Sequence, residues 1–295
     1  MNKKLLSGLL SIILLTGCTA TVNPTTTASA SEKIKVITSI NPVDQLVKYI
    51  GGDKVETTLF VPPGIEPHDF EPSARQMTAL KESKVLFING LDMEHWAEAG
   101  AITGSTKLMM LSDGVDVIPL DGGSDHSQGD PHVWLGLTEL KHMAENTATA
   151  LTILAPEDRA YFEDNLAKFN TEADALASEY DSKFAPYKGQ GFITGHEAFA
   201  YLCRNIGLIQ KAVQGPFAEG EPTPQKIKEL VDYVKAQQIT TIFVEELASP
   251  KVSDTLSRET GAKLVTLPTM ETQGEIFPTI REIYEKVLVS LELPK

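Results

Sequence analysis

Three histidines of this 295-residue chain stand in segments whose residue types could bind a metal ion. His68 lies in Pro-His-Asp-Phe-Glu-Pro-Ser, His132 lies in Asp-Pro-His-Val-Trp-Leu, and His196 follows the apolar segment 191–194. Imidazole nitrogens bind zinc, copper, iron and nickel, and a closed zinc site usually has four protein ligands. These histidines therefore need one further ligand to complete a shell around a divalent transition metal.

The fourth ligand is expected in the loop after the last predicted strand, residues 262–266. Glu271 lies in this loop, in Pro-Thr-Met-Glu-Thr, and is our candidate. Glu245 and Glu246 end another predicted strand and are alternatives for the same position. Spacing by itself is weak support, because these residues are far apart in the sequence and form no His-x-x-x-His pair.

Metal-binding histidines normally donate their other ring N–H to a carboxylate or a carbonyl. Three acidic residues adjoin or nearly adjoin the three histidines, and one ends a predicted strand. The candidates for this orienting role are Asp69, Asp130, Glu197 and Glu245. Two other histidines are predicted to lie outside the site, with His95 at the start of a helix and His142 on the polar face of one.

These loops need a scaffold that brings them together. Short apolar segments alternate with helical patterns in both halves of the chain, which is typical of parallel sheets with helices on both faces. Strands are predicted at 35–39, 55–61, 85–88, 115–118, 191–194, 241–244 and 262–266. Open α/β sheets bind ligands beyond the carboxyl ends of their strands, where His68 and His196 are placed by this prediction.

Residues 137–184, between the two halves, have almost no strand signal. After a break at 155–158, apolar residues recur every three or four positions, which predicts one buried stripe along a long helix. We therefore predict an α/β protein of two lobes, each a parallel sheet flanked by helices, with the metal site in the cleft between them. The predicted parts are an N-terminal lobe at 33–150, a linking backbone helix at 151–187 and a C-terminal lobe at 188–295.

The N-terminal segment indicates export. A short apolar run follows Lys3 and Lys4 and ends in Leu-Thr-Gly-Cys, which is typical of a secretory signal peptide and too short to cross a bilayer. Its end resembles the lipobox of bacterial lipoproteins, in which the cysteine, here Cys18, becomes diacylated. We predict a signal peptide at 1–17 and a lipidated, flexible tether at 18–32, anchored on the outer face of the cell membrane. A Gram-positive location is favoured over a periplasmic one.

Charge and cysteine content exclude other classes of protein. The net charge of −14 argues against nucleic acid or anionic lipid as a ligand. With Cys18 lipidated, Cys203 is left alone, so no disulfide framework is expected. Cys203 lies in an apolar run and is predicted to be a small buried residue.

Three segments, in this order, resemble the zinc/manganese ABC-transporter solute-binding lipoprotein family: Pro-His-Asp-Phe-Glu-Pro-Ser, Asp-Pro-His-Val-Trp-Leu and Ile-Thr-Gly-His-Glu-Ala-Phe-Ala-Tyr. In that family the metal lies between two α/β lobes joined by a long helix. The resemblance implies His68, His132, His196 and Glu271 as ligands. It implies Zn²⁺ as the transported ion, because the third ligand is often Glu in manganese members, and Mn²⁺ or iron as the alternative.

The same resemblance implies a membrane permease and a cytoplasmic ATPase of an ABC importer as partners, with the receptor acting as a monomer. One feature departs from the family, because many zinc members have a long His-rich loop where residues 122–129 contain His126 as their one histidine. A secreted metallohydrolase would need an open metal position and a general base, and no His-Glu-x-x-His motif occurs. A surface adhesin stays open as an alternative, and it would have an exposed apolar patch. We therefore predict a protein that binds metal without catalysing a reaction.

Overall fold

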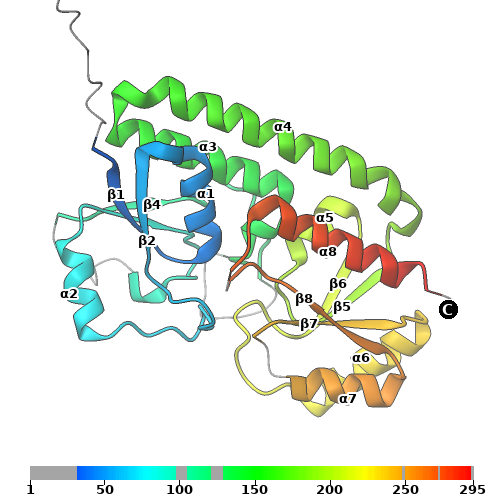
Figure 1. Cartoon of the computed structure of the whole chain (residues 1–295). Helices are drawn as coiled ribbons and strands as arrows, with labels where there is room; N and C mark the ends of the chain where they lie inside the picture. The colour runs from blue at the N-terminus through cyan, green and yellow to red at the C-terminus, as the bar shows by residue number, and fades with distance from the viewer. Residues whose placement is uncertain (1–31, 98–104, 121–128, 248–249, 272, 294–295) are drawn as a thin grey trace, which may run out of the picture. The chain divides into compact units, whose positions relative to one another are not determined.

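The computed structural model describes residues 32–97, 105–120, 129–247, 250–271 and 273–293. Residues from Glu32 onward form one compact unit, whose described part contains two four-stranded parallel sheets (Figure 1). This is the predicted α/β architecture. Cys18 and His126 lie outside the described residues.

The first sheet has the strand order β2-β1-β3-β4, with every pair parallel. Its strands are β1 (Ile34–Thr38), β2 (Val55–Leu59), β3 (Val85–Ile88) and β4 (Lys107–Met110). Helix α1 (Asn41–Gly51) follows β1, and helix α2 (Ala74–Glu82) lies between β2 and β3. We call this sheet with its two helices the first lobe.

The prediction of a fourth strand at 115–118 is wrong. The strand that pairs with β3 is Lys107–Met110, in the register Val85 to Lys107. Residues 115–118 run in an irregular loop whose backbone groups are satisfied elsewhere. The N–H of Ile118 donates to the hydroxyl of Tyr201, and its carbonyl accepts from the N–H of Asp130.

The second sheet has the order β6-β5-β7-β8 and is also parallel. Its strands are β5 (Gly191–His196), β6 (Ile209–Gln214), β7 (Thr241–Glu245) and β8 (Lys263–Leu267). Helices α5 (Ala200–Ile206), α6 (Pro224–Ala236) and α7 (Pro250–Thr260) complete what we call the second lobe. Strand β6 was not predicted, because it is a half-exposed edge strand whose polar residues give no continuous apolar run.

Two long antiparallel helices connect the lobes in the sequence, α3 (Leu137–Leu154) and α4 (Arg159–Phe184). Residues 151–154 of the predicted linking helix belong to α3, because Pro156 begins a short 3₁₀ turn that separates the two helices. The predicted stripe on α4 is buried at Phe162, Phe169 and Tyr180. It packs on α3 and on α8 (Ile276–Leu291), which runs beside α4 (Figure 1).

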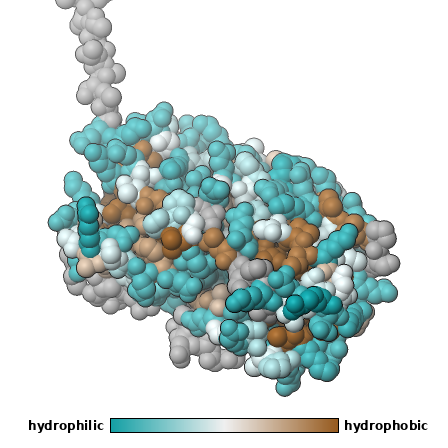
Figure 2. Space-filling model, turned by 60° about the horizontal axis from the view of Figure 1, so that its bottom comes forward, coloured by the Kyte–Doolittle hydropathy of each residue, from teal (hydrophilic) through white to brown (hydrophobic). Residues whose placement is uncertain are grey.

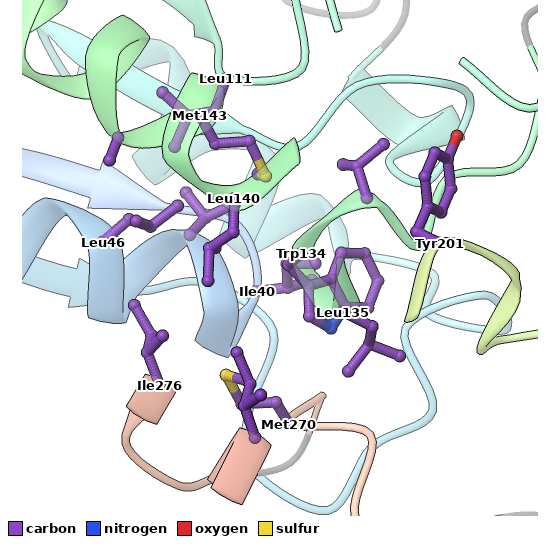
Figure 3. Packing of buried hydrophobic residues seen from close by; sticks show 14 of the residues in the cluster. Ile40, Leu46, Leu111, Trp134, Leu135, Leu140, Met143, Tyr201, Met270 and Ile276 are labelled. Carbon is purple, nitrogen blue, oxygen red and sulfur yellow. The ribbon is translucent and has the colours of Figure 1, made fainter. Parts of the chain in front are cut away.

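A single hydrophobic cluster extends from the first lobe through α3 and α4 into the second lobe. Figure 3 shows part of this cluster, which includes Ile40 and Trp134 from the first half of the chain and Met270 and Ile276 from the second. Cys203 belongs to this cluster and is buried, as predicted. The loops beyond the sheets are therefore fixed on a shared core.

No helix in the described part of the chain is both long and apolar enough to cross a bilayer. Figure 2 shows one face of the protein, on which hydrophobic areas are interrupted by hydrophilic residues. The large apolar side chains with the greatest exposure among the described residues are Ile153 and Val289, which lie on different helices.

Candidate metal centre

The four predicted ligands come from four separate segments, two in each half of the chain. His68 lies in the loop between β2 and α2, and His132 lies just before the 3₁₀ turn Val133–Leu135 that leads into α3. His196 is the last residue of β5, and Glu271 follows β8. His68, His196 and Glu271 thus lie at or beyond the carboxyl ends of strands, where the prediction placed them, and His132 lies in a loop.

The structure brings the four side chains together around His132. Its Nε2 atom lies 3.2 Å from Nε2 of His68, 3.3 Å from Nε2 of His196 and 3.6 Å from Oε1 of Glu271. One ligand atom from each residue lies within 4.8 Å of the other three. In a tetrahedral zinc site with bonds of about 2.0–2.1 Å, ligand atoms are separated by about 3.3 Å. The arrangement fits one four-coordinate ion.

The site is enclosed by protein on most sides. His132, His196 and Glu271 are buried, with no more than 4 % of each residue exposed, whereas His68 is half-buried. The ring of Phe217 packs edge-on against that of His68, with 5.6 Å between the ring centroids. Exchange of an ion with solvent is therefore expected on the His68 side.

Asp130 orients His132. Its Oδ1 atom accepts from the backbone N–H of His132 at 2.9 Å and lies 2.8 Å from Nδ1 of the ring. The ring is thereby turned so that Nε2 faces the other ligands. Burial, together with the charge of His196, lowers the pKa of His132 well below its usual value, so the imidazole is neutral, as a metal ligand must be.

Glu245 has a similar place beside His196. Its Oε1 atom accepts from the backbone N–H of His196 at 3.2 Å and lies 3.7 Å from Nδ1. This approach requires a glycine at position 195, because a Cβ atom there would lie 2.7 Å from Oε2 of Glu245. Burial lowers the pKa of His196, but the hydrogen bond and charge of Glu245, with the charges of Glu271 and Glu66, raise it to about 9.

Glu271 presents one free oxygen to the histidines. Its Oε2 atom accepts from the hydroxyl of Thr269 at 2.6 Å, and its Oε1 atom, which faces His132, has no hydrogen-bond partner among the described residues. Burial, followed by the charge of Glu66, raises the pKa of Glu271 to about 8. A buried carboxylate oxygen of this kind is well suited to a cation, which would stabilise its ionised form.

Sequence reasoning missed Glu66. Its Oε1 atom accepts from the backbone N–H of His68 at 3.3 Å, and burial raises its pKa. The signal that could have found it is a shared pattern, because Glu66-Pro67-His68 and Asp130-Pro131-His132 both place an acid two residues before a ligand candidate. In each case the acid accepts from the backbone N–H of that histidine.

Other candidates lie elsewhere. Asp69 is exposed, and Glu197 lines a cavity next to the site together with Asp130 and Phe217. Neither belongs to the ligand group, and the exposed Glu246 does not belong to it either.

The two histidines predicted to lie outside the site do so. Nε2 of His95 lies 3.2 Å from Glu71, and Nε2 of His142 lies 3.0 Å from the carbonyl of Asp113.

This geometry can be compared with known proteins. The family described as zinc-uptake complex component A, periplasmic (ZnuA), matches residues 36–291, which is most of the chain. The chain belongs to the ZnuA family. A relative named as a putative metal-binding protein, from Treponema pallidum, is 33% identical over 262 residues, covering 83% of this chain and 82% of the relative.

Relatives of this ZnuA-family chain differ in the metal that they are named for. The zinc-binding lipoprotein AdcA of Streptococcus pneumoniae is 30% identical over 272 residues and 88% of this chain, which spans about half (54%) of AdcA. The manganese ABC transporter substrate-binding lipoprotein PsaA of the same species is 30% identical over 261 residues, covering 85% of this chain and 84% of PsaA.

A solved structure has the same fold. The laminin-binding protein Lmb of Streptococcus agalactiae, described as bifunctional with adhesin and metal-transporting activity, superposes with a TM-score of 0.82. It is 28% identical in sequence, and the match covers 88% of this ZnuA-family chain and all of the Lmb chain.

Proposed function

We propose that this protein is an extracytoplasmic receptor that captures Zn²⁺ and delivers it to an ABC importer. The observation that carries the proposal is the group of three imidazole nitrogens and one carboxylate oxygen, His68, His132, His196 and Glu271, at separations that fit a single tetrahedral ion. Membership of the ZnuA family and the names of AdcA and PsaA support a transported divalent metal.

The donor set favours zinc over manganese. Three nitrogens and one oxygen make a borderline-soft, four-coordinate shell, whereas manganese favours oxygen donors and octahedral coordination. The general order of affinities of divalent metals also places zinc above manganese. Both arguments give the same preference.

The shell also argues against catalysis at the metal. A catalytic zinc keeps one position open for water or substrate and usually has three protein ligands. Four protein ligands fill a tetrahedral zinc shell, so the proposed site binds and releases its ion without an open position for chemistry.

Transport requires partners and a location. We infer that the receptor docks as a monomer on a membrane permease served by a cytoplasmic ATPase, and that a diacylated Cys18 holds it on the outer face of the membrane of a Gram-positive type of cell. Support comes from the lipobox-like Leu-Thr-Gly-Cys segment, from AdcA, which is named as a zinc-binding lipoprotein, and from PsaA, which is named as a substrate-binding lipoprotein of a manganese ABC transporter.

The test is a competition titration of purified, metal-free protein with Zn²⁺ and Mn²⁺, with the bound metal measured per chain. We expect one tightly bound Zn²⁺ per chain and displacement of Mn²⁺ by Zn²⁺. Two equivalent tight sites, or equal affinity for the two ions, would contradict the proposal.

A further inference from the structure

Glu271 lies in a loop with an unfavourable backbone. Its neighbour Met270 has φ +68°, in the left-handed region that side chains other than glycine avoid, and Met270 is fully buried. This conformation is unfavourable for a residue with a side chain, and it persists where the surroundings hold it in place. A cause for this conformation is offered by the groups that donate hydrogen bonds to the loop.

The contacts come from the first lobe. The side-chain amide of Asn41, at the start of α1, donates to the carbonyl of Met270 at 2.8 Å and to that of Gly274 at 3.2 Å. These carbonyls lie on the two sides of Glu271 in the sequence. One asparagine from the first lobe therefore spans the segment that carries the fourth ligand candidate.

A second donor acts from beside His132. The indole Nε1–H of Trp134 donates to the carbonyl of Thr269 at 2.9 Å, and Trp134 is fully buried. Figure 3 shows Trp134 and Met270 within the same packed cluster. Thr269 in turn donates through its hydroxyl to Oε2 of Glu271, which leaves Oε1 toward His132. Donors from the first lobe and from the turn after His132 thus act on the position of a carboxylate in the loop after β8.

We propose that Asn41 and Trp134 are positioning residues for metal binding, which hold the strained Thr269–Met270 turn so that Glu271 is preset as the fourth ligand when the lobes are in contact. Without these donors the turn relaxes to an ordinary backbone conformation, and the fraction of molecules with Glu271 in place falls. The apparent affinity for zinc falls by the same factor. This inference rests on the proposed four-ligand zinc site.

The hydrogen bonds of Asn41 and Trp134 also link metal binding by Glu271 to the contact between the lobes. All three hydrogen bonds cross from the first lobe or its His132 loop to the loop after β8. Separation of the lobes would break them and release the strain at Met270. Loss of the fourth ligand would then accompany opening, which is a direct route from opening to metal release.

The decisive experiment is a double-mutant cycle on zinc affinity with Asn41→Ala and Glu271→Ala. Asn41→Ala removes two hydrogen bonds and is expected to weaken zinc binding by about tenfold or more. In the Glu271→Ala background the same change should have almost no further effect, because its action runs through Glu271. Equal weakening in both backgrounds would overturn the inference.

Asn165→Ala is a matched control. Asn165 is also a buried asparagine, and its amide donates to a backbone carbonyl, that of Ile50, at 3.0 Å, on the α4 side of the molecule. This variant should lower the melting temperature of the metal-free protein while leaving zinc affinity unchanged. If Asn165→Ala weakened zinc binding as much as Asn41→Ala, a general loss of stability would explain both.

Trp134→Phe provides a second variant, which keeps an aromatic ring in the core and removes the N–H donor. It should weaken zinc binding by about fivefold and, like Asn41→Ala, lose this effect in the Glu271→Ala background. If Asn41→Ala does not fold, Trp134→Phe replaces it in the double-mutant cycle. Failure of the proposed site itself would give a different result. Unchanged zinc affinity in Glu271→Ala alone would show that Glu271 is not a ligand and would refute the proposed four-ligand site.

Discussion

One carboxylate oxygen of Asp130 serves both the ring and the backbone of His132, at 2.8 Å from Nδ1 and 2.9 Å from the backbone nitrogen. His132 is the centre of the candidate site, since its Nε2 atom lies within 3.6 Å of an atom from each of the other three residues. Asp130, which is fully buried, therefore fixes the orientation of His132, around which the other three residues are grouped.

We predict that Asp130→Ala weakens zinc binding by about 10–100-fold, because removal of a carboxylate that orients a metal-bound histidine typically has this effect. Asp69→Ala is the matched control, since Asp69 also adjoins a ligand candidate but is exposed, and it should leave the affinity unchanged. The measurement is the Kd for zinc from competition with a chelator. Equal affinities for Asp130→Ala and wild type would remove Asp130 from the site.

A second prediction concerns the anchor. Cys18→Ala should abolish incorporation of labelled palmitate and release the protein from membranes, because the lipobox-like segment then has no thiol to acylate. Cys203→Ala is the control, since Cys203 is buried in the core and should not affect labelling. Continued labelling of the Cys18 variant would show that the anchor lies elsewhere.

The sequence predicted the scaffold well where continuous apolar runs mark strands buried on both faces, as in β3 and β7. The sequence did not predict β6, because this partly exposed edge strand contains polar residues. It wrongly placed a strand at 115–118, where the N–H of Ile118 donates to the hydroxyl of Tyr201 in α5 and not to a neighbouring strand. A local sequence pattern indicates which residues are buried, but strand pairing depends on which other segment the fold places next to a strand.

The candidate site also includes residues that could be predicted from the sequence and residues that could not. The positions of His68, His196 and Glu271 after predicted strands were weak support by themselves, and the full set with His132 was implied by the resemblance to the family. Glu66 could have been found from the shared acid-Pro-His pattern. Asn41 could not, because it is 229 residues from Met270 in the sequence, and no periodicity links an asparagine at a helix start to a carbonyl in a distant loop.

Glu94 offers a prediction about stability. This buried carboxylate accepts from the hydroxyl of Ser39 and from the backbone N–H groups of Asn89 and Gly90, which joins the carboxyl ends of β1 and β3. Glu94→Ala would leave these donors without an acceptor, at a cost of about 2–4 kcal/mol in the free energy of unfolding. Denaturant unfolding of the metal-free protein checks this. Glu82→Ala, at an exposed position on α2, should change it by less than about 0.5 kcal/mol.

Metal removal should destabilise the protein. An ion that binds the folded chain alone stabilises it by mass action, by about 2.7 kcal/mol when free zinc is 100 times its Kd. We therefore expect a chelator to lower the melting temperature and added zinc to restore it. The variant His132→Ala should show little of this response to zinc. A wild-type melting temperature independent of zinc would contradict tight binding to the folded state.

The last prediction is that His196 is largely responsible for the preference for zinc. His196→Glu replaces a nitrogen donor by oxygen, which favours manganese, and we expect zinc affinity to fall by at least about tenfold while the preference for zinc over manganese narrows.

The new carboxylate would also lie beside Glu245, whose Oε1 atom is 3.7 Å from Nδ1 of His196 in the present structure. Added negative charge attracts every divalent cation, so it cannot by itself change the ratio of the two affinities. The ratio of zinc to manganese affinity, from competition titration, is therefore the quantity to measure. His142→Glu, outside the site, should leave this ratio unchanged. If wild type binds manganese as tightly as zinc, or if His196→Glu retains full zinc affinity, then His196 does not bind the metal and the assignment of the shell is wrong.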